Sequence, residues 1–173
     1  MSCLPEIAYR YGKDARGYAL LLALTDPALK RREYPEVSFS VIRTVAVGVL
    51  GIEPDAAKRQ IKTLSHLTAE TPSATLENVP IFKNKITVSH AGRAETAFTN
   101  ELGPPIEWKA AFPGSFRTLL PDGKAVPAQI ERDAAGNSHT LVIIQVSSAR
   151  SVTVRTPSGN TKPRSCCPLG QQS

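Results

Sequence analysis

Residues 106–112, with the sequence IEWKAAF, decide the fold class because their apolar and polar residues alternate with a period of two. Ile106, Trp108, Ala110 and Phe112 therefore share one face, as expected for a half-buried strand. Trp108 is the only tryptophan of the chain. Its place between two apolar residues of the same face favours a core position over a platform on which a sugar stacks.

The second half of the chain repeats this pattern between explicit turn signals. The further period-two segments are 86–88, 94–98, 126–130, 141–143 and 152–154, and within them Leu141 and Ile143 are expected on the buried face. Asp122-Gly123 is the strongest hairpin signal, His90–Arg93 predicts a short hairpin, and Asp133–Asn137 predicts a longer loop. Strands at this spacing indicate an antiparallel, jelly-roll-like β-sandwich, in which Pro127 marks an edge.

The first half of the chain has a helical period instead. Its apolar residues recur at spacings of three and four and predict two short helices, 5–11 and 15–24, with Asp14 as the N-cap of the second. Pro27 ends that helix. The fold class is therefore mainly β with two or three N-terminal helices, divided into a helical segment (1–54), a sandwich (55–156) and a disordered tail (157–173) rich in Pro, Gly, Ser and Gln.

A third helix is expected from Pro35 to a C′ glycine at Gly51, because valines repeat every fourth residue from Val37 to Val49. Phe39 and Ile42 extend its apolar surface almost all round. Such a helix needs neighbours on several sides, and three short helices supply too few. We therefore expect that this chain is part of a larger protein.

Candidate chemical groups are sparse, and we expect no catalytic residue, no metal site and no cofactor. Glu33 and Glu36 could form the carboxylate pair of a sugar hydrolase. The simpler interpretation is that Glu36, in a first helical turn, offsets the helix dipole. Glu33 can be an ordinary surface partner of the basic residues that precede it. His66, His90 and His139 are too far apart for a local metal motif, and Ser38 and Ser40 lack a Gly-x-Ser-x-Gly turn. Three cysteines without a partner pattern give no zinc site and no disulfide framework: Cys3, Cys166 and Cys167.

Charge and hydropathy restrict the partners. The net charge is +6, but the basic residues of the second half are single and not interleaved with aromatic residues, so we do not expect nucleic acid as a partner. No apolar run reaches the roughly 20 residues of a membrane span, and the first residues show no signal peptide, which makes the cytoplasm the default location. A processed start would hide such a signal.

The order of these parts resembles one enzyme family. Residues 35–42 (PEVSFSVI) lead into 48–54 (GVLGIEP), then a strand at 59–64, then 78–80 (NVP) and 85–88 (KITV). This order is similar to the end of a six-hairpin α/α-toroid glycoside hydrolase of the α-L-rhamnosidase kind, whose last barrel helix exits into a C-terminal β-sandwich. Phe39 stands where that family often has tryptophan.

The resemblance implies a function for the chain. It implies a C-terminal fragment of a glycosidase, inactive by itself, with the sandwich as an accessory domain and the rest of the catalytic domain and a carbohydrate as partners. It places Glu36, Ser38, Phe39 and Ser40 near a sugar pocket, while no residue matches the acid and base of the family. The alternative is a non-catalytic β-sandwich that binds carbohydrate or protein.

Overall fold

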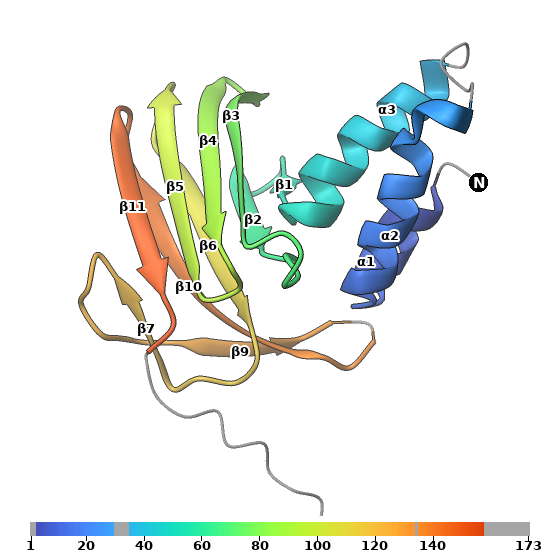
Figure 1. Ribbon diagram of the computed structural model, residues 1–173. Helices are drawn as coiled ribbons and strands as arrows, with labels where there is room; N and C mark the ends of the chain where they lie inside the picture. Colours follow the sequence, from blue (N-terminus) through green and yellow to red (C-terminus); the bar gives the residue numbers. More distant parts are fainter. Residues whose placement is uncertain (1–2, 30–34, 134, 158–173) are drawn as a thin grey trace, which may run out of the picture.

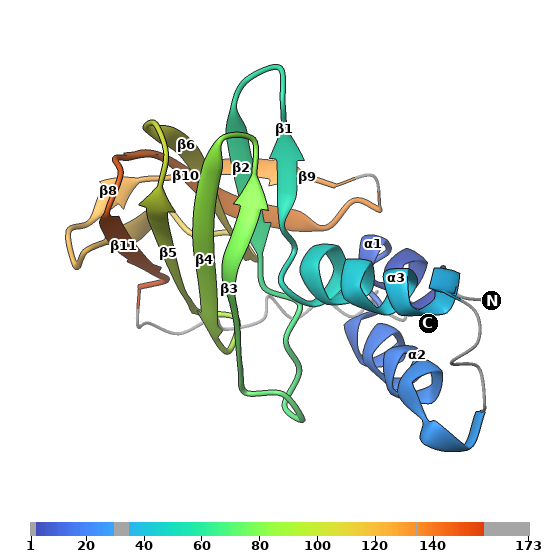
Figure 2. The ribbon, with the colours of Figure 1, turned by 90° about the horizontal axis from the view of Figure 1, so that it is seen from above.

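The computed structural model describes residues 3–29, 35–133 and 135–157, and in it three helices lie together on one side of two β-sheets (Figures 1 and 2). Helix α1 spans Leu4–Arg10, α2 spans Asp14–Thr25 and α3 spans Pro35–Arg43. A short 3-10 turn, η1 (Pro27–Leu29), follows α2, and α3 continues directly into the π-helical segment η2 (Thr44–Val49). The expected helices are confirmed, whereas the π-helical end of the third was not predicted.

The remaining chain forms the expected sandwich-like pair of sheets. The five-stranded sheet has the order β1 (Glu53–Asp55), β2 (Gln60–Leu64), β6 (Ile106–Pro113), β10 (Ser138–Val146), β9 (Gln129–Arg132). The six-stranded sheet has the order β3 (Ser73–Ile81), β4 (Asn84–Ala91), β5 (Glu95–Leu102), β11 (Arg150–Arg155), β7 (Thr118–Pro121), β8 (Val126–Pro127). All pairs are antiparallel except β2 with β6, which run parallel. The fold is therefore mainly β and mostly antiparallel.

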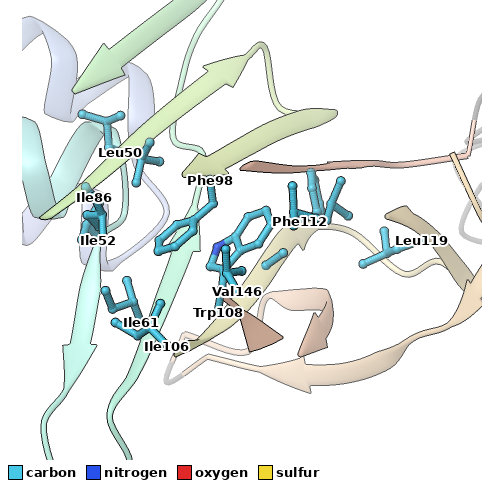
Figure 3. Close-up of a cluster of buried hydrophobic side chains, with 14 residues drawn as sticks. Leu50, Ile52, Ile61, Ile86, Phe98, Ile106, Trp108, Phe112, Leu119 and Val146 are labelled. Atoms are coloured by element: carbon cyan, nitrogen blue, oxygen red, sulfur yellow. The ribbon is translucent and has the colours of Figure 1, made fainter. Parts of the chain in front are cut away.

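The core between the sheets is built on the strand that decided the fold class. All four inward residues of β6 are buried, and the Trp108 ring stacks on Phe98 of β5 with centroids 5.1 Å apart (Figure 3). The indole Nε1 donates to Thr63 Oγ1 at 2.9 Å, so the polar atom of this side chain also has a partner. Trp108 is a core residue, as predicted, and has no exposed face for a sugar.

Two strand predictions are wrong in detail. On β10 the inward residues are Thr140, Val142, Ile144 and Val146, which pair with the inward residues of β6, so Leu141 and Ile143 lie on the outer face. The apolar run of β10 hides its period, which explains the error. The expected strand 126–130 is split at Pro127 between β8 and β9, and each of these is an edge strand of a different sheet. Proline cannot donate to a sheet ladder, which agrees with this break.

The end of the third helix enters the sandwich core. Leu50 and Ile52 are buried in the same cluster as Trp108, and Gly51 between them has φ +55°, as predicted for a C′ glycine. The His90 ring of β4 contacts this exit: its Nε2 lies 3.0 Å from the Leu50 carbonyl oxygen and its Nδ1 lies 2.8 Å from Thr96 Oγ1. Because a carbonyl only accepts, Nε2 carries the proton and Nδ1 accepts from the threonine hydroxyl.

The buried ring of His90 should make the free energy of unfolding depend on pH. Burial lowers its pKa to about 4, against the opposing effect of the hydrogen bond to Leu50. The unfolded chain binds this proton near pH 6.5, so the stabilisation is complete above that pH and is lost as the pH falls towards 4, by roughly 3 kcal/mol in all. Urea unfolding of the wild type and of His90→Gln at pH 7 and pH 4.5 measures this. The variant should show the smaller pH effect, and an equal pH effect in both proteins would contradict the assignment.

Candidate functional site

The four residues expected near a sugar pocket all lie on α3. Glu36, Ser38 and Phe39 are exposed and Ser40 is half-buried. Ser38 and Ser40 are two residues apart, so they point to nearly opposite sides of the helix. None of the four belongs to the lining of the three cavities that the structure shows at residues 12–16, at residues 53–62 and beside α1. A shared role in sugar binding therefore stays a prediction, and Glu33 lies outside the described residues.

An apolar surface of the helices is uncovered. Phe39 is 70 % exposed and Ile42 is 66 % exposed, and their spacing of three places them on one face of α3. Val37 and Val41, on the other side of the helix, are half-buried. Six of the ten large hydrophobic side chains exposed in the described part of the chain belong to the helices and their caps: Leu4, Ile7, Tyr11, Leu22, Phe39 and Ile42. Exposed apolar groups that gather in one part of a molecule are typical of a contact surface.

A buried carboxylate links the helices to two loops of the sandwich. Asp14, the first residue of α2, is buried, and its carboxylate lies 2.9 Å from His66 Nδ1 and 2.9 Å from Arg93 Nη1. The expected N-cap role of Asp14 is wrong: Lys13 occupies the N-cap position and makes no side-chain cap bond. The carboxylate contacts His66 and Arg93 of the sandwich instead, and hydrogen bonds between two charged groups are among the strong ones.

Tyr9 of α1 packs at the centre of the helical part. A Cβ added to Gly17 of α2 would lie 2.9 Å from its ring, and one added to Gly48 of η2 would lie 2.6 Å from it. Both glycines thus allow the close approach of this ring. The ring also meets that of His66 edge to face at 5.7 Å. Burial, together with the charge of Asp14, raises the pKa of Tyr9 to about 12, which keeps the phenol neutral at pH 7.

A polar cavity of about 90 Å³ lies where α1 meets the outer face of the five-stranded sheet. Its lining includes Tyr9 and Arg10 of α1, Glu53 of β1, Lys62 of β2 and His139 of β10. The Lys62 ammonium lies 3.1 Å from the Glu53 carboxylate. His66 and Asp133 complete the polar groups of the lining. The cavity thus collects two imidazoles and one ion pair, together with Arg10 and Asp133, from segments that are remote in the sequence.

The second imidazole is held by a carboxylate, as the first is. Asp133 Oδ2 lies 3.1 Å from His139 Nε2, and the carboxylate also accepts from the backbone of Ala135 and from the backbone and side chain of Asn137. Desolvation opposes ionisation of Asp133, but the bonds from Asn137 and His139 outweigh it and hold its pKa well below the usual range. The charged carboxylate therefore orients His139 from a firmly bonded loop.

The chemistry of these groups has clear limits. Among residues 3–29, 35–133 and 135–157, no three His, Cys, Asp or Glu side chains are placed to hold a metal ion. Within the described part of the chain, no helix has the length and apolar character needed to cross a membrane. The two held imidazoles were missed by sequence reasoning because each histidine and its aspartate belong to different segments, and only the short spacing of Asp133 and His139 could have indicated one pair.

Comparison of the chain with protein-family models, with curated proteins and with solved structures gave no match. The fold and the exposed side chains define the chain as a two-sheet, sandwich-like β-protein with N-terminal helices whose apolar side chains are partly uncovered.

Proposed function

We propose that this chain is the C-terminal, non-catalytic part of a carbohydrate-active enzyme of the glycosidase type. In this proposal the helices continue an α/α-toroid catalytic domain, and the sandwich is a structural accessory domain that packs on it. The observation that carries the proposal is the apolar face of α3, with Phe39 and Ile42 mostly exposed on a helix that continues into the buried segment η2. A helix with partners on several sides would bury this face.

The attachment of the helices to the sandwich supports this role. Leu50 and Ile52 lie in the sandwich core, and Asp14 binds His66 and Arg93. A rigid connection would hold an accessory domain in one orientation on its catalytic domain, whereas a flexible linker would not. The resemblance of residues 35–54 to the exit of a toroid barrel supplies the enzyme class.

The alternative is a carbohydrate-binding module, and Trp108 does not supply the exposed aromatic surface on which a sugar would stack. Trp108 is fully buried, and its ring stacks on Phe98 inside the core. The lining of the polar cavity beside α1 contains groups that could bind a hydroxylated ligand.

An activity assay on the natural gene product tests the proposal. An antibody against the sandwich isolates the protein that contains it, and aryl glycosides serve as substrates. We expect that the isolated natural product hydrolyses at least one aryl glycoside while the 173-residue chain alone hydrolyses none. Turnover by the chain alone, or a natural product without glycosidase activity, would overturn the proposal.

A further inference from the structure

The largest of the three cavities lies where the connection from α1 to α2 faces two loops of the sandwich. Its volume is about 820 Å³, which is within the range of roughly 300–1,000 Å³ typical of sites for small organic molecules. Residues 12–16 form one wall, and the other walls belong to the loop between β2 and β3 (65–72) and to the turn between β4 and β5 (92–94). No residue of α3 belongs to this lining.

Hydrogen bonds join the walls of this cavity to one another. The backbone N–H of Gly92 donates to the carbonyl oxygen of Pro72 at 2.7 Å, and the Ser65 hydroxyl donates to the carbonyl oxygen of Gly92 at 2.6 Å. On the helical side, a carboxylate oxygen of Asp14 lies 2.9 Å from Arg93 Nη1 in the same turn. The cavity is therefore formed by the fold itself, as is usual for ligand sites.

The charges in the lining are unbalanced. The lining contains one carboxylate, that of Asp14, which is buried against His66 and Arg93. Lys13 and Arg16 are exposed, and neither forms an ion pair with any residue in the described ranges. A cleft lined by charges of one sign attracts ions of the opposite sign. The lining therefore selects an anion.

The third cation of the lining can also contribute to an anion site. Arg93 contacts Asp14 through Nη1, and its side chain is still 47 % exposed. A guanidinium carries five N–H donors, so donors remain for a second acceptor. Hydrogen bonds from arginine or lysine to an anionic oxygen are among the strong ones.

The uncharged part of the lining restricts the kind of anion. Ala15, Ala69 and Pro72 are exposed and present apolar surface to the cavity. An inorganic anion would leave this surface in contact with water, whereas an uncharged apolar molecule would leave the cations without a partner. A molecule with one acidic group on an apolar body satisfies both parts of the lining, because it gains from apolar burial and from charge-assisted hydrogen bonds.

We propose that the cavity bounded by residues 12–16, the β2–β3 loop and the β4–β5 turn binds a small organic anion. Its acidic group is held by Lys13 and Arg16, and its apolar body lies against Ala69 and Pro72. This site goes beyond the proposed function. It requires neither the apolar face of α3 nor any enzymatic activity, so its failure and the failure of the proposed function are distinguishable.

Nuclear magnetic resonance of the full chain tests this inference through the backbone amide signals of Gly12, Ala15 and Gly92. Octanoate and octyl phosphate are titrated separately, with octan-1-ol as the uncharged body and acetate as the acidic group alone. We expect a saturable shift of these signals with octanoate or octyl phosphate, and at least tenfold weaker binding of octan-1-ol and acetate. The tighter of the two anions identifies the acidic group as a carboxylate or a phosphate.

Two cavity variants change the charge of the lining at exposed positions. Arg16→Met removes one cation and keeps the length of the side chain, and the affinity for the anion should fall about tenfold. Ala69→Glu introduces a carboxylate that repels the anion and should weaken binding at least as much. The unfolding midpoint of each variant verifies that it is folded.

Matched controls complete the test. Lys124→Met removes an exposed lysine in the turn between β7 and β8, outside this lining, and should leave the affinity unchanged. Phe39→Ser should also leave it unchanged, which separates this cavity from the apolar face of α3. No shift of the three amide signals with either anion, octan-1-ol binding as tightly as octanoate, or equal affinity in the wild type and both cavity variants would overturn the proposal.

Discussion

Replacing Gly51 by alanine is expected to destabilise the protein by more than about 4 kcal/mol, which is exceptional for one methyl group. Gly51 has φ +55°, and an added Cβ would lie 2.1 Å from the carbonyl oxygen of Leu64. Neither atom can move away easily, because the clash is with the backbone next to the sheet. The exit of η2 into the sandwich core would have to shift, and Leu50 and Ile52 would leave their positions.

Gly92→Ala is the matched control for this substitution. Gly92 has nearly the same backbone angle, φ +57°, but an added Cβ meets no atom within 4 Å. The expected loss of unfolding free energy for Gly92→Ala is about 1–2 kcal/mol, because only the left-handed backbone conformation is unfavourable for alanine there. Urea unfolding of both variants gives the two free energies. Similar costs for the two variants would show that the tight exit at Gly51 is not needed for the fold.

Replacing Trp108 by alanine is expected to cost about 3–5 kcal/mol, the range for a fully buried large aromatic residue. The substitution leaves a void beside Phe98 and removes the donor that satisfies Thr63. Trp108→Phe is the control, because it keeps an aromatic ring beside Phe98 while it loses the indole N–H and part of the ring volume. Urea unfolding ranks the three proteins.

This prediction also separates two roles of the tryptophan. A buried ring gives blue-shifted fluorescence that a soluble saccharide does not change. If Trp108 were a sugar platform instead, the alanine variant would keep its stability and a saccharide would alter the emission. Retained stability of Trp108→Ala, together with a change in the wild-type tryptophan emission on addition of a saccharide, would therefore contradict the core position of this ring.

Sequence patterns predicted the elements whose residues have a clear local period. The alternation of residues 106–112 and the turn at Asp122-Gly123 depend on nearest neighbours, and the structure has both as expected. The prediction of which face of β10 is turned to the core was wrong because apolar residues occupy both faces. Leu141 contributes to a small outer cluster with Leu64 and Ala111. A periodic pattern cannot show which of two apolar faces meets the core.

The polar cavity could not be predicted from the sequence because it depends on tertiary pairing. Asp14 and His66 are separated by 52 residues. His139 and Lys62 come onto one face of the sheet because β10 pairs antiparallel with β6 and β2 pairs parallel with it. The parallel pairing of β2 with β6 was itself unexpected. By contrast, the uncovered face of α3 followed from its own apolar pattern, since Phe39 and Ile42 lie opposite the valines that pack inward.

The uncovered face of α3 is the central claim, and binding of a fluorescent apolar dye to the purified chain tests it most directly. The account predicts that the chain binds the dye, and that Phe39→Ser with Ile42→Ser abolishes most of the binding without lowering the unfolding midpoint. Leu102→Ser, which changes a side chain 62 % exposed on the sandwich, should have little effect. No dye binding by the wild-type chain, or a double variant that binds as much dye as the wild type, would contradict the account.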